Sequence, residues 1–319
     1  MRVLTHLGRR VRHPVGRSRP REAVVLSGGG CLGAAQVGAL QELFAAGIRP
    51  DLLVGCSVGA LNAAALAVDP TPERLGALED FWRGLTGRDV FGGAVPALGH
   101  LVRRDAHLYD PHALHALIRR WVPVRDLAET AVPLEVATTD LLTGTTCWWS
   151  SGDPVTVLSA SACLPAVFPP VALNGSLHVD GGVTVPVPLS RAVELGAARV
   201  WVLDVTGGTI GRRDDRMTAL DVLLLSFAIS RQRLADEAGM PVGRRAATRV
   251  VRLPALDVGR LEMRDFSQTD RLIRLGRAAA RAALVGQRQA GPVPPAQRAS
   301  PSSLLSLATP STRSSSPRA

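Results

Sequence analysis

The chain has 319 residues, 46% of them apolar, which is enough to bury the core of one large domain. Its formal net charge of +10 lies at the two ends, because residues 1–21 carry seven arginines and residues 271–319 carry eight, with no acidic residue in either segment. Of the 37 basic residues, all arginine, 22 remain in the middle against 27 acidic residues. The body is therefore acidic, and we expect no nucleic-acid partner, which would need a basic face on the fold.

Residues 1–21, rich in Arg, Pro and Gly, and residues 287–319, rich in Pro and Ser, lack a hydrophobic period, so both are predicted to be disordered. The four cysteines show no CxxC spacing, and no apolar signal segment precedes residue 22. The apolar run at 222–230 is shorter than the ~20 residues that cross a bilayer. We expect a cytoplasmic protein whose arginine-rich ends can attract it peripherally to a membrane surface.

The predicted folded domain covers about residues 22–286. Short β-branched runs alternate with longer helical patterns, which favours an α/β fold with a mainly parallel central sheet covered on both faces. About residues 70–130 differ, because they contain helical windows and no clear strand. This segment is predicted to be a helical insertion, either a lid beside a site or a plain packing layer.

The first motif is the glycine-rich stretch "SGGGCLG", which follows a predicted strand and opens a helix. Gly28, Gly29 and Gly30 allow a sharp turn and place bare N–H groups at the positive end of that helix, where they can bind an anion or an oxyanion. Gly28, Gly30 and Gly33 also satisfy G-x-G-x-x-G, so a dinucleotide loop is an alternative. That loop needs an acid at the end of the next strand, whereas Asp51 precedes it.

The second motif, "GCSVG", matches G-x-S-x-G and lies between an apolar strand and an alanine-rich helix. Gly55 and Gly59 permit the strained turn that projects Ser57 outward as a nucleophile. The alternative is that Ser57 merely caps the helix. Cys56 has no basic neighbour in sequence that would activate a thiolate, so we expect it to be a buried structural residue.

The third motif is Asp180-Gly181-Gly182, at the end of a short β-like run. No histidine follows His178, which argues against a Ser-His-Asp triad. A carboxylate within hydrogen-bond reach of a serine can act as its base directly. The alternative is a hairpin turn, and His178 is interpreted as a neighbour of the aspartate rather than a catalyst.

In this order the three motifs resemble the patatin-like phospholipase family, as does the segment "SASACLPAVFPPVALNGSLHVDGG" that leads to the aspartate. The resemblance implies a three-layer α/β/α fold and a Ser57–Asp180 dyad, with the amides of the Gly28–Gly30 loop holding the oxyanion. It implies a lipid acyl hydrolase that cleaves ester-linked acyl chains with no metal or organic cofactor. It leaves the oligomeric state open.

The sequence departs from the family pattern in two places. Leu32 stands where the glycine loop usually carries a basic residue, and Val185 and Pro186 stand where asparagines often follow the aspartate motif. A catalytically silent relative that binds lipid or a protein partner is therefore the alternative to an active hydrolase.

Overall fold

The computed structural model describes residues 22–92, 107–206, 219–237, 248–258 and 265–289. The described strands form one mixed sheet in the order β5-β6-β3-β2-β1-β7-β8, with β4 also paired to β3. The strands are β1 (Glu22–Leu26), β2 (Leu52–Cys56), β3 (Leu134–Asp140), β4 (Thr146–Trp149), β5 (Val171–Leu173), β6 (Ser176–Asp180), β7 (Arg199–Leu203) and β8 (Arg249–Arg252).

The centre of the sheet is parallel, as the alternation of strands and helices predicts. β1 pairs in parallel with β2 and β7, and β3 and β8 extend this part in both directions. β4 and β6 are antiparallel to β3, and β5 is antiparallel to β6. The sheet therefore has a parallel core and an antiparallel side, and only the core was predicted.

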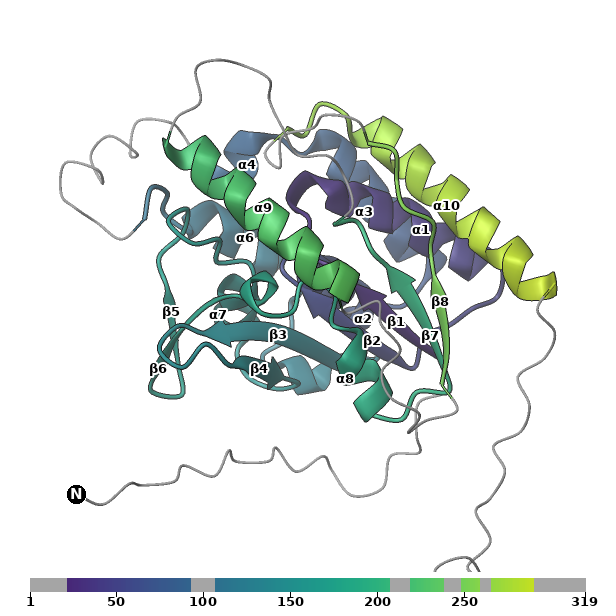
Figure 1. The fold of residues 1–319 in the computed structure, drawn as a ribbon, viewed down its shortest axis with the longest axis horizontal. Coiled ribbons are helices and arrows are strands. Elements are labelled where there is room, and N and C mark those ends of the chain that lie inside the picture. The colour runs from purple at the N-terminus through teal and green to yellow at the C-terminus, as the bar shows by residue number, and fades with distance from the viewer. Residues whose placement is uncertain (1–21, 93–106, 207–218, 238–247, 259–264, 290–319) are drawn as a thin grey trace, which may run out of the picture.

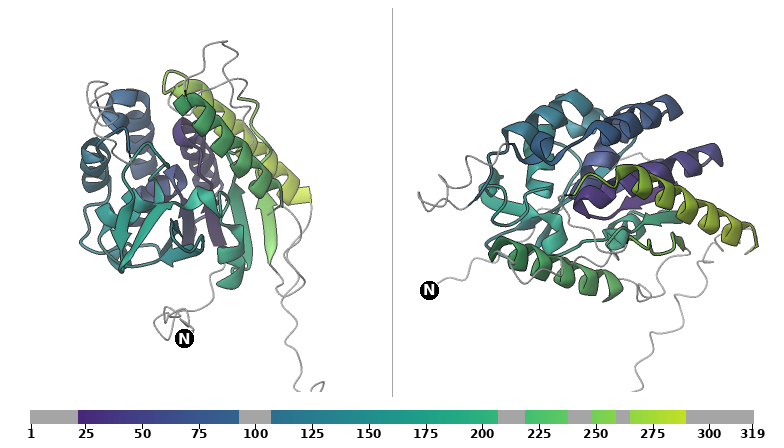
Figure 2. Two further views of the ribbon diagram at one scale, coloured as in Figure 1. Left: turned by 60° about the vertical axis from the view of Figure 1, so that its left-hand side comes forward. Right: turned by 90° about the horizontal axis from the view of Figure 1, so that it is seen from above.

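Helices cover both faces of this sheet (Figures 1 and 2). In β1, Ala23 and Val25 pack toward α8 (Leu189–Glu194), whereas Val24 and Leu26 pack toward α1 (Gly33–Ala45), α2 (Val58–Val68) and α10 (Thr269–Gln289). This burial on both faces explains the continuous apolar run of the strand. The three-layer α/β/α prediction is confirmed.

The helices are α1 (Gly33–Ala45), α2 (Val58–Val68), α3 (Pro72–Gly84), α4 (Gly87–Phe91), α6 (His112–Trp121), α7 (Pro154–Ser161), α8 (Leu189–Glu194), α9 (Ala219–Glu237) and α10 (Thr269–Gln289), with 3₁₀ turns η1 (Gly30–Leu32), η2 (Leu127–Glu129) and η3 (Gly181–Val183).

The segment predicted as a helical insertion contains α3, α4, α6 and η2, and no strand occurs in its described part. Residues 93–106 of the insertion lie outside the described residues, as do the predicted disordered leader and most of the tail. Helix α10 continues through 287–289 of the segment that we assigned to the tail. Across the part of the chain that the structure describes, no helix is both long and apolar enough to cross a membrane.

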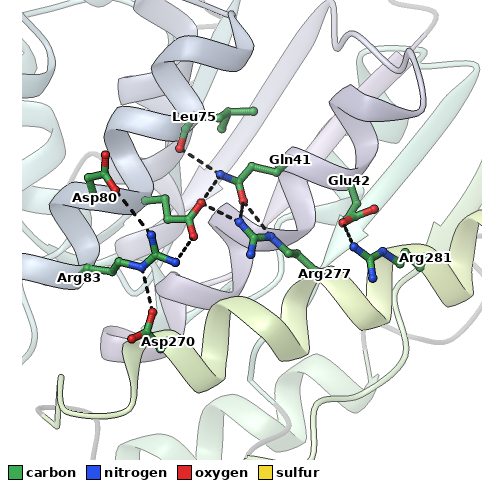
Figure 3. Close-up of polar contacts among 9 residues, drawn as sticks. Gln41, Glu42, Leu75, Asp80, Arg83, Asp270, Arg277 and Arg281 are labelled. Carbon is green, nitrogen blue, oxygen red and sulfur yellow. Dashed lines mark hydrogen bonds and ion pairs between the residues drawn. The ribbon is translucent and has the colours of Figure 1, made fainter.

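A buried carboxylate joins the insertion to α1 and α10 (Figure 3). Glu79 of α3 accepts from Gln41 of α1 and pairs with Arg277 of α10, both at 2.7 Å. Arg83, one turn further along α3, bridges Glu79 at 2.6 Å and Asp270 at 2.8 Å. Because Glu79 is nearly inaccessible to solvent, its charge depends on these partners.

Glycines let α1 and α10 pack unusually closely. A Cβ atom at Gly276 of α10 would overlap the carbonyl group of Ala35, and one at Gly38 of α1 would overlap that of Ile273. A side chain as small as alanine cannot be accommodated at either position without moving one of the two backbones. The C-terminal helix is therefore an integral part of the domain.

We expect Gly276→Ala to lower the free energy of unfolding by about 1–3 kcal/mol, because the new methyl group forces α10 away from α1. The matched control is Gly286→Ala in the same helix, where a Cβ meets nothing within 4 Å. That change should be neutral or stabilising by up to ~1 kcal/mol, since alanine is the better helix former. Urea unfolding of both variants tests this, and equal midpoints would contradict the close packing.

Candidate active site

Ser57 occupies the turn between β2 and α2 in a conformation that serine rarely adopts. Its φ of 55° lies in the left-handed region, and α2 begins at the next residue. The flanking glycines allow this turn, because a Cβ at Gly59 would overlap the carbonyl of Leu26 and one at Gly55 would lie 2.5 Å from the backbone of Ala60. The hydroxyl of Ser57 accepts no hydrogen bond from a backbone N–H of α2, so Ser57 is not a conventional helix cap.

A second serine, Ser161, anchors the turn through a hydrogen bond. The backbone N–H of Ser57 donates to the hydroxyl of Ser161 at 3.0 Å, and that hydroxyl donates to the carbonyl of Ala137 in β3 at 2.7 Å. Ser161 comes from α7 and is completely buried. The strained turn is thus fixed to the sheet by a hydrogen bond from outside its own strand and helix.

Asp180 lies next to this turn because two strands end at the same place on β3. β2 pairs with β3 up to Cys56 opposite Ala137, and β6 pairs with β3 up to Asp180 opposite Thr138. β4 occupies the opposite edge of β3 at these positions, so β2 and β6 meet along one edge from opposite directions. The meeting of these two strand ends brings residues 57 and 180 together.

The Asp180 carboxylate is buried and only 1% exposed. Its Oδ1 accepts from the N–H of Gly182 at 2.7 Å, so the aspartate caps η3 rather than turning a hairpin. Oδ2 is also buried and has no hydrogen-bond partner of normal length among the described residues. Burial raises the pKa of Asp180, while the charge of Arg231 and hydrogen bonding by the Ser57 hydroxyl oppose this increase. The carboxylate thus has one oxygen available to accept a proton.

The segment after the aspartate is held without asparagine side chains. The hydroxyl of Thr184 bonds those of Thr139 at 2.9 Å and Thr146 at 2.8 Å. The carbonyl of Pro186 accepts from the N–H of Gly28 at 3.0 Å. The loop after Asp180, which has Val185 and Pro186 in place of asparagines, is therefore still anchored to β3 and to the glycine loop.

The predicted oxyanion loop lies beside the same turn. The N–H of Gly28 is engaged by Pro186, whereas the N–H groups of Gly29 and Gly30 make no hydrogen bond to the described part of the protein. Gly30 and Ser57 both line one cavity. The N–H groups of Gly29 and Gly30 are therefore not engaged by described residues, Gly30 lies at the same cavity as Ser57, and Gly28 joins the glycine loop to the loop after Asp180.

Cys56 and His178, the residues weighed as alternatives to the serine and the aspartate, are both buried in the fold. Cys56 is fully buried, and burial raises the pKa of its thiol well above the usual range, as expected for a structural cysteine. His178 is buried in β6, where its Nδ1 lies 3.0 Å from the hydroxyl of Thr138 and its ring packs edge-on against Trp149. No group of three or more His, Cys, Asp or Glu side chains in the described ranges is arranged to hold a metal ion.

The cavity at Ser57 is almost entirely apolar and contains about 880 Å³ of space, part of it open to solvent. One wall is α2, which contributes Val58, Leu61 and Ala65 at helical spacing. The facing wall consists of side chains from α3, α4 and α6, such as Phe81 and Leu117. The insertion is therefore a wall of the cavity rather than a remote packing layer.

A buried hydrogen-bonded chain joins this wall to the glycine loop. The indole of Trp82 in α3 donates to Asn62 of α2 at 3.1 Å, and Asn62 donates to Gln36 of α1 at 3.0 Å. Gln36 then donates to the carbonyl of Ser27 at 2.7 Å, immediately before the glycines. Three helices thus hold the end of β1 in position.

A family model described as "Patatin-like phospholipase" matches residues 24–193, which include the glycine loop, the serine turn and the aspartate. The chain belongs to the patatin-like phospholipase family. This assignment excludes the dinucleotide-loop alternative, which also lacked an acid at the end of β2.

Curated relatives agree with this family. An uncharacterized NTE family protein of Mycobacterium tuberculosis is 27% identical over 203 residues, 63% of this chain and 53% of that protein. Another from the same species is 27% identical over 282 residues, 83% of this chain and 46% of that protein. The chain thus spans about half the length of these relatives. Among solved structures, VipD from Legionella pneumophila matches 84% of this chain and 67% of VipD at 14% identity, with a TM-score of 0.46.

Sequence patterns located the three patatin-like motifs but missed the residues that support them. Ser161, Asn62 and Gln36 are polar residues within apolar helical stretches, and that isolation is the only sign of their role. Arg231 follows the apolar run at 222–230, one of many arginines in an arginine-rich chain. Only the fold places it beside Asp180.

We expect Asp180→Asn to stabilise the protein at pH 8. The pKa of the Asp180 carboxyl is higher in the folded protein than its unfolded-state value of ~3.9, so the stability of the fold declines as pH rises from the unfolded value through the folded value. Asparagine does not ionise, so the variant does not lose this stability. The melting temperature of the variant should exceed that of the wild type at pH 8, with the difference vanishing near pH 3. Asp140→Asn is the opposite control, because hydrogen bonds from Ser176 and Thr143 lower the Asp140 pKa. A lower melting temperature for Asp180→Asn at pH 8 would contradict this prediction.

Proposed function

We propose that this patatin-like protein is a lipid acyl hydrolase that uses Ser57 as nucleophile and Asp180 as its base. The observation that carries the proposal is the strained Ser57 turn, which opens into an apolar cavity on one side and adjoins a buried carboxylate on the other. A serine that only capped α2 would need none of these features.

In the proposed reaction, Ser57 Oγ attacks the carbonyl carbon of an ester while its proton passes to Asp180. The oxygen of that carbonyl becomes an oxyanion, for which the N–H groups of Gly29 and Gly30 are the donors; such a donor is typically worth ~3 kcal/mol. The C–O bond to the alcohol then breaks, and the alcohol leaves with the proton held by Asp180. In the second half, water attacks the acyl carbon and gives a proton to Asp180. The C–O bond to Ser57 then breaks, Ser57 Oγ takes the proton back from Asp180, and the carboxylic acid leaves.

The proposed substrates are esters with long acyl chains, because the cavity offers apolar walls and few polar groups. Each buried methylene contributes about 0.8 kcal/mol to binding. The family name and the NTE family relatives support a lipid substrate. Peripheral contact with a membrane surface fits such a substrate.

Labelling with a fluorophosphonate probe tests the activated serine directly. The Ser57 oxygen attacks phosphorus, the P–F bond breaks and fluoride leaves, while the proton passes to Asp180. We expect the wild type to be labelled and Ser57→Ala not. Ser159→Ala is the matched control, because Ser159 is also buried but does not line the cavity, and its hydroxyl has no hydrogen-bond partner among described residues. An unlabelled wild type would favour the second candidate, a silent lipid-binding relative.

A further inference from the structure

Helix α9 brings a buried arginine, Arg231, close to the glycines on either side of the candidate site. Arg231 is only 3% exposed, although both neighbours at 230 and 232 are exposed. Figures 1 and 2 show α9 on the other side of the molecule from α3, α4 and α6. No described residue of α9 lines the cavity, whereas Arg231 lies close to Gly28 and Gly182.

Arg231 lies between the glycine loop at residues 28–30 and the Gly181-Gly182 pair that follows Asp180. A Cβ atom at Gly28 would lie 3.3 Å from its Nη2, and one at Gly182 would lie 3.2 Å from its Nε. Its guanidinium also lies 5.6 Å from the ring of Phe227, one turn earlier in α9. Both glycine positions are thus in contact with one side chain from a distant helix.

Asp180 is surrounded by few charged or titratable groups. Cys56 of β2 and Cys163, which follows α7, interact with it electrostatically, and burial raises the pKa of both thiols, so that both are neutral. Among the described groups that influence Asp180, Arg231 is the one cation, and it acts to lower the Asp180 pKa. Residues 28–33 of the glycine loop, "GGGCLG", contribute no charged side chain.

We propose that Arg231 is a positioning residue that acts through Asp180, by holding a positive charge beside the carboxylate and by packing between the glycine loops. This inference rests on the proposed Ser57–Asp180 reaction. A buried carboxylate accepts the serine proton only after it has lost its own, and a cation fixed beside it favours that charged form. Arg231 thereby supplies, from α9, the charge that the glycine loop lacks.

The test is the pH dependence of fluorophosphonate labelling in Arg231→Gln, which removes the charge but keeps a polar side chain. We expect the acidic limb of the labelling rate to move to higher pH. A move of one pH unit corresponds to about tenfold slower labelling at the acidic end. Arg231→Lys should restore the wild-type midpoint, while Arg233→Gln, at an exposed position of the same helix, should leave the profile unchanged. An unchanged midpoint in folded Arg231→Gln would overturn the proposal.

Urea unfolding at pH 8 provides a readout that needs no activity. Arg231→Gln should lower the unfolding midpoint more in the wild type than in the Asp180→Asn background, because only the wild type leaves a buried carboxylate without its cation. If Arg231→Gln fails to fold in the wild-type background but folds in the Asp180→Asn background, the proposal is equally supported. Equal decreases of the unfolding midpoint in both backgrounds, or failure to fold in both, would overturn it. If the wild type is not labelled at all, the proposed function fails, and this cycle still decides whether Arg231 and Asp180 are coupled.

Discussion

Replacing Ser57 with alanine is expected to lower kcat for ester hydrolysis by at least ~10⁴-fold, to the level left by binding alone. In the proposed reaction the Oγ atom forms the acyl-enzyme bond, and no other hydroxyl or thiol occurs among the described residues that line the cavity. The neighbouring Cys56 is fully buried, and its raised pKa keeps it a thiol. Asp180→Asn should cause a loss of similar size, since the amide cannot accept the serine proton.

The two residues act as one unit, so their effects should not add. The double variant is expected to be no slower than the worse of the two single variants. Hydrolysis of 4-methylumbelliferyl esters measures all three, with melting temperatures to show that each is folded. Ser159→Ala should retain wild-type rates, and His178→Gln should retain most of them. Near-normal turnover in Asp180→Asn, or complete loss in His178→Gln, would show that the base is not Asp180.

Narrowing the cavity is expected to change chain-length preference by more than an order of magnitude. Ala65 lies on the cavity wall eight positions after Ser57 along α2, about 12 Å at ~1.5 Å per residue. In Ala65→Phe the ring would occupy space needed by the distal part of a long acyl chain. Excluding three methylenes at ~0.8 kcal/mol each would lower kcat/KM about 60-fold.

The measurement is the ratio of kcat/KM for decanoate and acetate esters in the wild type and in Ala65→Phe. The acetate ester is the internal control, because its acyl group remains beside Ser57 and its rate should not change. A uniform decrease for both esters would mean that the ring disturbs the serine turn. An unchanged ratio would mean that the acyl chain does not run along α2.

The sequence was sufficient to predict the parallel core and the serine turn, because both depend on local patterns. An apolar run, a Gly-Cys-Ser-Val-Gly turn and an alanine-rich helix follow one another within residues 51–68. The antiparallel pairing of β6 with β3 was not predictable, since it joins Asp180 to Thr138 across a long stretch of chain. The position of Arg231 depends in turn on the packing of α9 and has no local pattern.

The Gly-Gly pair after Asp180 shows how a local rule can mislead. Asp-Gly commonly marks a hairpin, but here the carboxylate folds back onto the N–H of Gly182 and begins a 3₁₀ turn. A sequence pattern cannot separate these outcomes, because both use the same freedom of the glycine backbone.

The hydrogen-bonded chain from Trp82 to Ser27 sets a limit on how this fold can be redesigned. Helices α4 and α6 contribute side chains to the cavity, so under the proposed function we expect that replacing them alters chain preference. Trp82 in α3, by contrast, belongs both to the cavity wall and, through Asn62 and Gln36, to the support of the glycine loop. A chimera that keeps the chain through Leu85 and replaces the insertion after it would separate selectivity from turnover, whereas one joined before α3 would alter both together.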